Sequence, residues 1–203
     1  MSPEWFGRFG DIPGVSYTAP AYVDRAALAG CQERPEVRRL GEEASLWWPQ
    51  GNTSASPVHR RGFDSELQSD GPHDVVRLLE ETLELPGEAS DYHFAIQNAL
   101  GMVLGGRRSD PTVLEAAERL AWLDIRLLQA RPEAITNDRT ERRPEEPRFY
   151  RVPTFHHLIS LYEREGALQE ALDVAEIAVR FEQLETKRDE IAARLTALTR
   201  DPA

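Results

Sequence analysis

The sequence predicts an all-α protein of antiparallel helical hairpins, with an irregular N-terminal arm and a long C-terminal helix. Two observations support this class. From residue 70 onward, apolar residues recur at intervals of three and four, the period of an amphipathic helix. Over residues 70–203, apolar and polar residues nowhere alternate over a length that would predict a strand. The 203 residues therefore suit an N-terminal arm, residues 1–70, followed by a helical-hairpin domain, residues 71–203.

The predicted arm is irregular and aromatic. Proline and glycine interrupt its first twenty residues, which are also rich in Trp, Phe and Tyr. Aromatic residues at this density are uncommon in disordered segments, so we expect the arm to pack on the helical domain. Two short helices are expected within it, near Tyr22–Ala29 and Pro35–Leu46.

Proline and glycine delimit the first three helices of the domain. We expect helices from Pro72 to about residue 85, from Tyr92 to Leu104, and from Pro111 to about Ala130. The second helix is apolar on nearly every side, so it belongs in the middle of a bundle. Residues 131–153 carry four Pro, six Arg and five acidic residues, and we expect them to form a long charged insert.

Two further helices are expected after the insert. One runs from Thr154 to about Glu165 and ends at Gly166, and one long helix runs from Leu168 to about Thr199. The long helix carries a heptad-like seam with alternating spacings of three and four residues. The seam consists of Val174, Ile177, Phe181, Leu184, Arg188, Ile191, Leu195 and Leu198. This helix therefore caps the domain, packs on the arm, or pairs with the same helix of a second chain in a homodimer.

The spacing of apolar and small residues after the insert is the most informative pattern in the chain. Aromatic and aliphatic side chains share one face of the first helix, Gly166 allows a tight turn, and small residues let the next helix approach closely. The residues concerned are Phe155, Leu158, Tyr162, Gly166, Leu168, Ala171 and Ala178. This spacing resembles a tetratricopeptide (TPR) repeat.

The TPR resemblance covers two segments. Residues 153–183 carry the fuller match, and residues 92–130 carry a less complete one. The resemblance implies a helical-repeat protein whose inner helices line a groove for a protein or peptide. Such a protein would act as an adaptor, or as a regulatory or assembly subunit, without catalysis. The residues that would face the groove are Asn98, Met102, His156, Ser160, Glu163 and Arg164.

Two residues fall on the unexpected side of the helix predicted to begin at Pro111. Trp122 lies in the middle of the polar face, so we expect it to cover another element of the chain or to bind a partner. Asp124 lies in the middle of the apolar face, where a carboxylate has to be paired, hydrogen-bonded or protonated. Either an arginine pairs with Asp124, or Asp124 has a ligand-binding or catalytic role.

The polar residues leave an alternative function open. In it, the protein is a small all-α enzyme or ligand-binding protein with an interhelical pocket around Asp124, His93 and His156. His156 and His157 are adjacent, so on a helix they point about 100° apart and do not chelate one ion together. The sequence has no paired-cysteine motif, phosphate loop or dinucleotide fingerprint, so we expect no metal or cofactor.

Charge and composition restrict the class of partner and the location. The formal net charge of −11 disfavours a nucleic-acid partner, because phosphate binding needs an excess of positive charge. The sequence has no signal-peptide pattern and no run of about 20 apolar residues that could span a membrane. Cys31 is the single cysteine, so an internal disulfide is excluded. We therefore expect a cytoplasmic protein.

Overall fold

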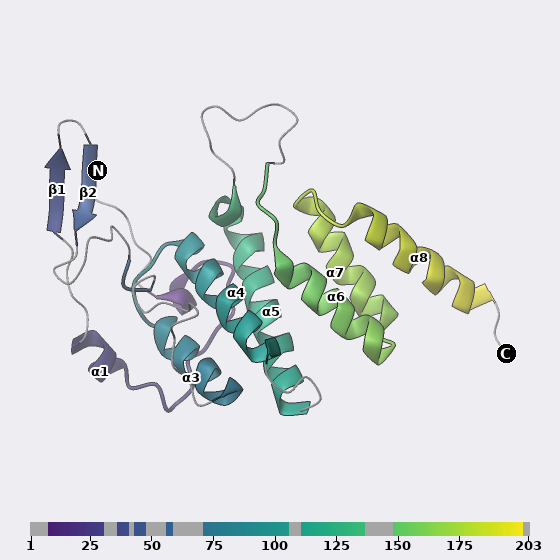
Figure 1. Cartoon of the computed structure of the whole chain (residues 1–203), viewed down its shortest axis with the longest axis horizontal. Helices are drawn as coiled ribbons and strands as arrows, with labels where there is room; N and C mark the ends of the chain where they lie inside the picture. The colour runs from purple at the N-terminus through teal and green to yellow at the C-terminus, as the bar shows by residue number, and fades with distance from the viewer. Residues whose placement is uncertain are drawn as a thin grey trace. The chain divides into compact units, whose positions relative to one another are not determined.

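The computed structural model describes residues 8–30, 36–40, 43–47, 56–58, 71–105, 111–136 and 148–200. The chain divides into two compact units, Met1–Ala134 and Ile135–Ala203 (Figure 1). The sequence places a boundary near residue 70, whereas the compact units divide inside the expected insert. The reason is that the N-terminal arm packs on the helices that follow it and so belongs to the first unit.

The first unit contains three long helices. They are α3 (Pro72–Thr82), α4 (Ala89–Gly105) and α5 (Pro111–Ala130). Helix α4 packs against both of the others, as expected for a helix that is apolar on nearly every side. The largest fully buried side chains of these helices are Leu79, Tyr92, Ile96, Leu100, Leu120, Ile125 and Leu127.

The described part of the arm packs through aromatic residues. The backbone N–H of Phe9, in a short 3-10 helix (Phe9–Asp11), donates to the carbonyl oxygen of Leu83 at 3.0 Å. The Phe9 ring meets the rings of Tyr17 and Tyr92 edge to face, with centroids 5.4 Å apart in each case. Phe9 is fully buried, so this contact fixes the segment around Phe9 against α3 and α4.

The two short helices expected in the arm fare differently. Helix α1 (Arg25–Gly30) lies where the first was expected, and the carboxylate of Asp24 caps it by accepting from the N–H groups of residues 26 and 27. The helix expected over Pro35–Leu46 is wrong. Strands β1 (Glu36–Leu40) and β2 (Glu43–Trp47) form an antiparallel pair there. The expected helix would have contained Gly41 in its interior, and glycine is unfavourable there.

The second unit contains α6 (Pro153–Glu165), α7 (Leu168–Arg180) and α8 (Glu185–Arg200). Helix α7 packs against both α6 and α8. Its residues Ala171, Val174, Ala175 and Ala178 are fully buried, and these small side chains allow the close approach that the sequence pattern predicts.

The predicted long C-terminal helix is wrong, because the chain turns between α7 and α8. The backbone of Glu182 and Leu184 is left-handed there, with φ of 58° and 60°. Two contacts account for the turn. The Phe181 ring packs on Phe149 and Phe155, and Gln183 accepts a hydrogen bond from the backbone N–H of residue 152 at 2.9 Å. The heptad-like seam is therefore divided between two helices.

The all-α class is confirmed for the main part of the fold. The described residues form seven α-helices, and the β1–β2 pair is the exception. None of the described helices is long and apolar enough to cross a membrane.

Candidate functional site

A buried histidine–aspartate pair joins α4 and α5. His93 Nδ1 lies 2.7 Å from Asp124 Oδ1, and their side chains are only 1% and 0% exposed. The expectation that Asp124 is buried and paired is therefore met, and His93 is one of its partners. Since neither side chain reaches solvent, the pair holds the helices together and does not present a reactive group to a substrate.

The residues of the alternative polar pocket come from both units. His93 and Asp124 are in contact, whereas His156 is an exposed residue of α6 in the second unit. No three His, Cys, Asp or Glu side chains among the described residues form a group that could hold a metal ion.

The residues expected to line a TPR-like groove are divided between the two units. Asn98 is exposed and Met102 half-buried on α4, and Trp122 is half-buried on α5. On α6, His156 and Arg164 are exposed, and Ser160 is half-buried.

Glu163, also expected to line the groove, binds other side chains of the same chain. Its carboxylate accepts hydrogen bonds from Lys187 and Arg194 of α8. Burial by itself would raise the pKa of Glu163, but these two cations outweigh burial and lower it. Glu163 therefore ties α8 to α6 in this structure.

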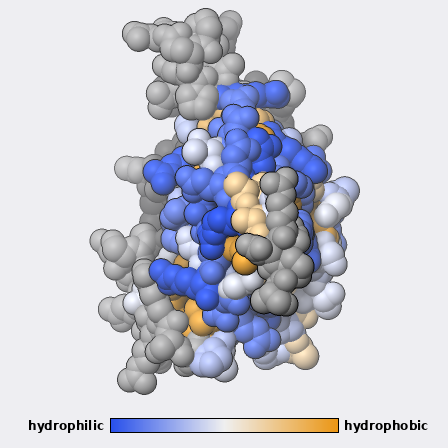
Figure 2. All heavy atoms as spheres, turned by 90° about the vertical axis from the view of Figure 1, so that its right-hand side faces the viewer, coloured by the Kyte–Doolittle hydropathy of each residue, from blue (hydrophilic) through white to orange (hydrophobic). Residues whose placement is uncertain are grey.

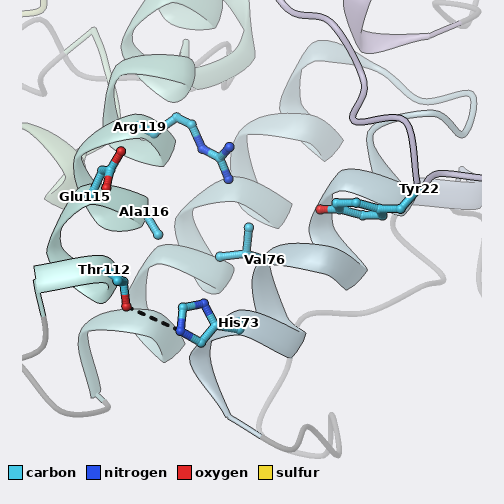
Figure 3. Close-up of a pocket in the computed structure, with 7 residues that line it drawn as sticks. All are labelled: Tyr22, His73, Val76, Thr112, Glu115, Ala116 and Arg119. Carbon is cyan, nitrogen blue, oxygen red and sulfur yellow. Dashed lines mark hydrogen bonds between the residues drawn. The ribbon is translucent and has the colours of Figure 1, made fainter.

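A groove of about 280 Å³ lies between α3 and α5 in the first unit (Figure 3). Five of its side chains are exposed, so the groove opens to solvent. Its lining consists of Tyr22 from the arm, His73 and Val76 from α3, and Thr112, Glu115, Ala116 and Arg119 from α5. Figure 3 shows the Tyr22 hydroxyl and the Arg119 guanidinium pointing into the groove from opposite sides.

Two contacts show that α3 and α5 run parallel. Near the start of both helices, His73 Nε2 lies 3.4 Å from the Thr112 hydroxyl. Seven residues later in both helices, Arg119 donates to Glu80 at 2.9 Å. The N-termini of the two helices therefore lie at the same end of the groove, and the positive ends of both helix dipoles favour a negative group there.

The Arg119 side chain is held in place by a buried carboxylate. The Glu80 side chain is 4% exposed and that of Arg119 59%. Burial raises the pKa of Glu80, and the charge and hydrogen bond of Arg119 oppose that rise. One N–H of Arg119 binds Glu80, and a guanidinium has four more donors to offer to a ligand.

The arm positions Tyr22 by contacts on either side of it. Arg25 Nε forms an ion pair with Glu84 Oε2 at 2.8 Å. On the other side, the Tyr17 hydroxyl is buried beside Glu80 and Glu84, and burial together with these carboxylates raises the pKa of Tyr17. The segment that carries Tyr22 is therefore anchored next to α3.

Comparisons with protein-family models, with curated proteins and with solved structures found no match. The groove is therefore interpreted from its own residues.

Sequence reasoning missed this groove. Its members Glu115 and Arg119 lie on the polar face of an amphipathic helix, where charged residues by themselves predict only contact with solvent. The signal that α3 covers this face was absent, because Glu80 and Arg119 are 39 residues apart and neither belongs to a motif.

Proposed function

We propose that the chain is a protein-binding module, acting as an adaptor or assembly subunit without catalysis, and that the α3–α5 groove holds a short segment of the partner. The observation that carries this proposal is the open groove in which Arg119, fixed by Glu80, faces Tyr22 across the apolar side chains of Val76 and Ala116. Tyrosine and arginine are among the residue types that most often dominate binding at protein interfaces.

The chemistry of the groove favours a segment with an acidic side chain. Arg119 can bind a carboxylate through two parallel N–H donors. The Tyr22 hydroxyl, the Thr112 hydroxyl and the two helix N-termini add further donors or positive potential. Glu115 is the acidic residue of the lining, and it would accept from a backbone N–H of the bound segment. Val76 and Ala116 would contact an apolar neighbour of the acidic residue.

The TPR resemblance supports the same class of function. The α6–α7 hairpin buries Phe155, Leu158, Ala171 and Ala178, the side chains on which the resemblance depends. The enzyme alternative has less support, because the His93–Asp124 pair, whose composition would suit catalysis, is enclosed in the core.

The proposal is tested by selecting ligands from a random seven-residue peptide library displayed on phage, with the full chain as bait. We expect enriched peptides to carry Asp or Glu beside an apolar residue. Ala116→Glu places a negative charge in the groove three residues before Arg119 on α5, where it competes with an acidic ligand for the guanidinium, and should weaken the binding of these peptides at least about tenfold.

The matched control is Gln129→Glu. It adds the same charge to an exposed position of α5 outside the groove, and should leave binding unchanged. Equal binding by the Ala116→Glu variant and the wild type would disprove the groove as the site, and the absence of any enrichment would disprove the function.

A further inference from the structure

The turn between α7 and α8 interrupts a sequence that reads as one helix. No glycine or proline occurs from Leu168 to Arg200, and the heptad-like seam continues through the turn at Phe181 and Leu184. The local preference of residues 181–184 is therefore helical, whereas the structure imposes a turn.

The turn contains unfavourable backbone. Glu182 and Leu184 both have left-handed φ values, which residues with a Cβ rarely adopt. The turn closes in a Schellman-type arrangement, in which the N–H of Gln183 donates to the carbonyl of Ala178 and that of Glu182 donates to Val179. A glycine normally occupies the position of Glu182 in this motif. Straightening residues 181–184 into a helix would remove the strain at both positions.

Helix α8 is the last helix of the second unit and packs along α7. Ile191 is its one fully buried side chain among the described residues, and its other described ties to α6 are the ion pairs of Lys187 and Arg194 with Glu163. Leu198 is 65% exposed. Figure 2 shows the face that lies on the right-hand side of Figure 1. This face is mainly hydrophilic, with hydrophobic residues only in small patches. All of these contacts can be made equally well with α6 and α7 of a second copy of the chain.

We propose that two copies of the chain exchange α8. In the exchanged dimer, residues 168–200 form one continuous helix, and α8 of each copy packs on α6 and α7 of the other. Ile191, Lys187 and Arg194 make the same contacts as in the monomer, but with the second copy. The exchange is reciprocal, so it closes as a symmetric dimer.

The closed turn also has stabilising contacts that the exchange gives up. The Gln183 side chain donates to the carbonyl oxygen of Tyr150 and accepts from the N–H of Val152. The Glu182 carboxylate accepts from the backbone N–H of Arg148. The monomer therefore prevails at low concentration. The dimer forms at high concentration, because the relief of strain and the retained α8 contacts offset these losses.

The first test compares two substitutions at one position. Glu182→Gly and Glu182→Ala both remove the carboxylate, so they differ only in backbone preference. Glycine favours the left-handed turn and alanine favours the continuous helix. We expect the dimer dissociation constant, measured by analytical ultracentrifugation, to be at least about tenfold lower for the Ala variant than for the Gly variant.

The second test asks whether the contacts are exchanged. One variant carries Glu163→Lys, and the other carries Lys187→Glu with Arg194→Glu. Each alone places like charges between α6 and α8. In an exchanged heterodimer, both sites have opposite charges. We expect the two variants to form a 1:1 heterodimer on mixing after partial unfolding, detected by native mass spectrometry.

Two results would overturn the proposal. The first is that the wild type and the Glu182→Ala variant both stay monomeric at about 1 mM after refolding at high concentration. The other is a dimer whose dissociation constant is the same for the Gly and Ala variants, with no preference for the heterodimer of the charge variants. That result would indicate pairing through an outer face.

Discussion

The two turns of the second unit have the same hydrogen-bond pattern and different residues. At the α6–α7 turn, the N–H of Ala167 donates to the carbonyl of Tyr162 at 2.9 Å. At the α7–α8 turn, the N–H of Gln183 donates to the carbonyl of Ala178 at 3.1 Å. The residue that donates the inner hydrogen bond of each turn is left-handed: Gly166, with φ of 76°, in the first turn, and Glu182, with φ of 58°, in the second. In the second turn Leu184 is left-handed as well, with φ of 60°.

The difference shows that one turn is encoded locally and the other is imposed by packing. Gly166 has no Cβ and adopts the left-handed conformation without a steric penalty, so the sequence predicts the end of α6. Glu182 has no such preference. The second turn is instead held by Phe181, whose ring centroid lies 5.6 Å from that of Phe155 and 5.3 Å from that of Phe149, and by the hydrogen bonds of Gln183.

The largest effect is expected from Phe181→Ala. Removing a buried aromatic ring should lower the free energy of unfolding of the second unit by about 3–5 kcal/mol. It should also release the α7–α8 turn, because the ring anchors it. Hydrogen exchange measured by mass spectrometry should show lost protection in α8, while the amides of α4 keep theirs. Unchanged protection in α8 would contradict an anchoring role for Phe181.

Gly166→Ala should have the next largest effect. No atom lies within 4 Å of the position of an added Cβ, so the cost is that of the left-handed backbone alone, about 1–2 kcal/mol. Urea denaturation followed by circular dichroism measures it. Gly101→Ala is the matched control: Gly101 lies inside α4 with the same open surroundings, so the same substitution should stabilise by about 0.5–1 kcal/mol. Equal effects at both positions would refute the distinction.

Gln183→Ala should cost about 1 kcal/mol, because it removes the hydrogen bonds to the backbone of Tyr150 and Val152 that support the second turn. Local hydrogen exchange at residues 150–152 and in α8 measures this loss. Gln169→Ala, which removes an exposed hydrogen bond to Asp173 within α7, should change little. If both substitutions behave alike, Gln183 does not support the turn.

The smallest effect is a pH dependence of the attachment of α8. The pKa of Glu163 is lowered in the folded state by Lys187 and Arg194. The stability from these pairs is therefore fully present above the ordinary carboxyl pKa of 4.5, and it is lost as the pH falls through the lower, folded pKa. The urea midpoint of the wild type should accordingly fall more between pH 6 and pH 3 than that of Glu163→Gln. Parallel pH profiles for the two proteins would exclude the link.

The sequence predicts those parts of the fold that depend on local signals. Helices α3 and α5 begin at Pro72 and Pro111, and α6 ends just before Gly166. These residues mark the helix termini because their backbone preferences act within one turn of a helix. The α7–α8 break was missed because Phe181 and Gln183 act through Phe149, Tyr150 and Val152, about 30 residues away.

The same limit applies to the site. The helical wheel correctly predicts that Asp124 faces the core, because burial follows from the period of one helix. It does not identify His93 as a partner, since that depends on how α4 lies along α5. The α3–α5 groove was missed for the same reason, because Tyr22, His73 and Arg119 come from three separate elements.

The His93–Asp124 contact has a consequence for how the first unit can change in evolution. A substitution of either residue alone removes a buried hydrogen bond between α4 and α5, at a cost of about 1–3 kcal/mol. Replacing both together with apolar residues of similar volume avoids that cost. The two positions are therefore expected to change as a pair, and while both are retained they fix the register of α4 along α5.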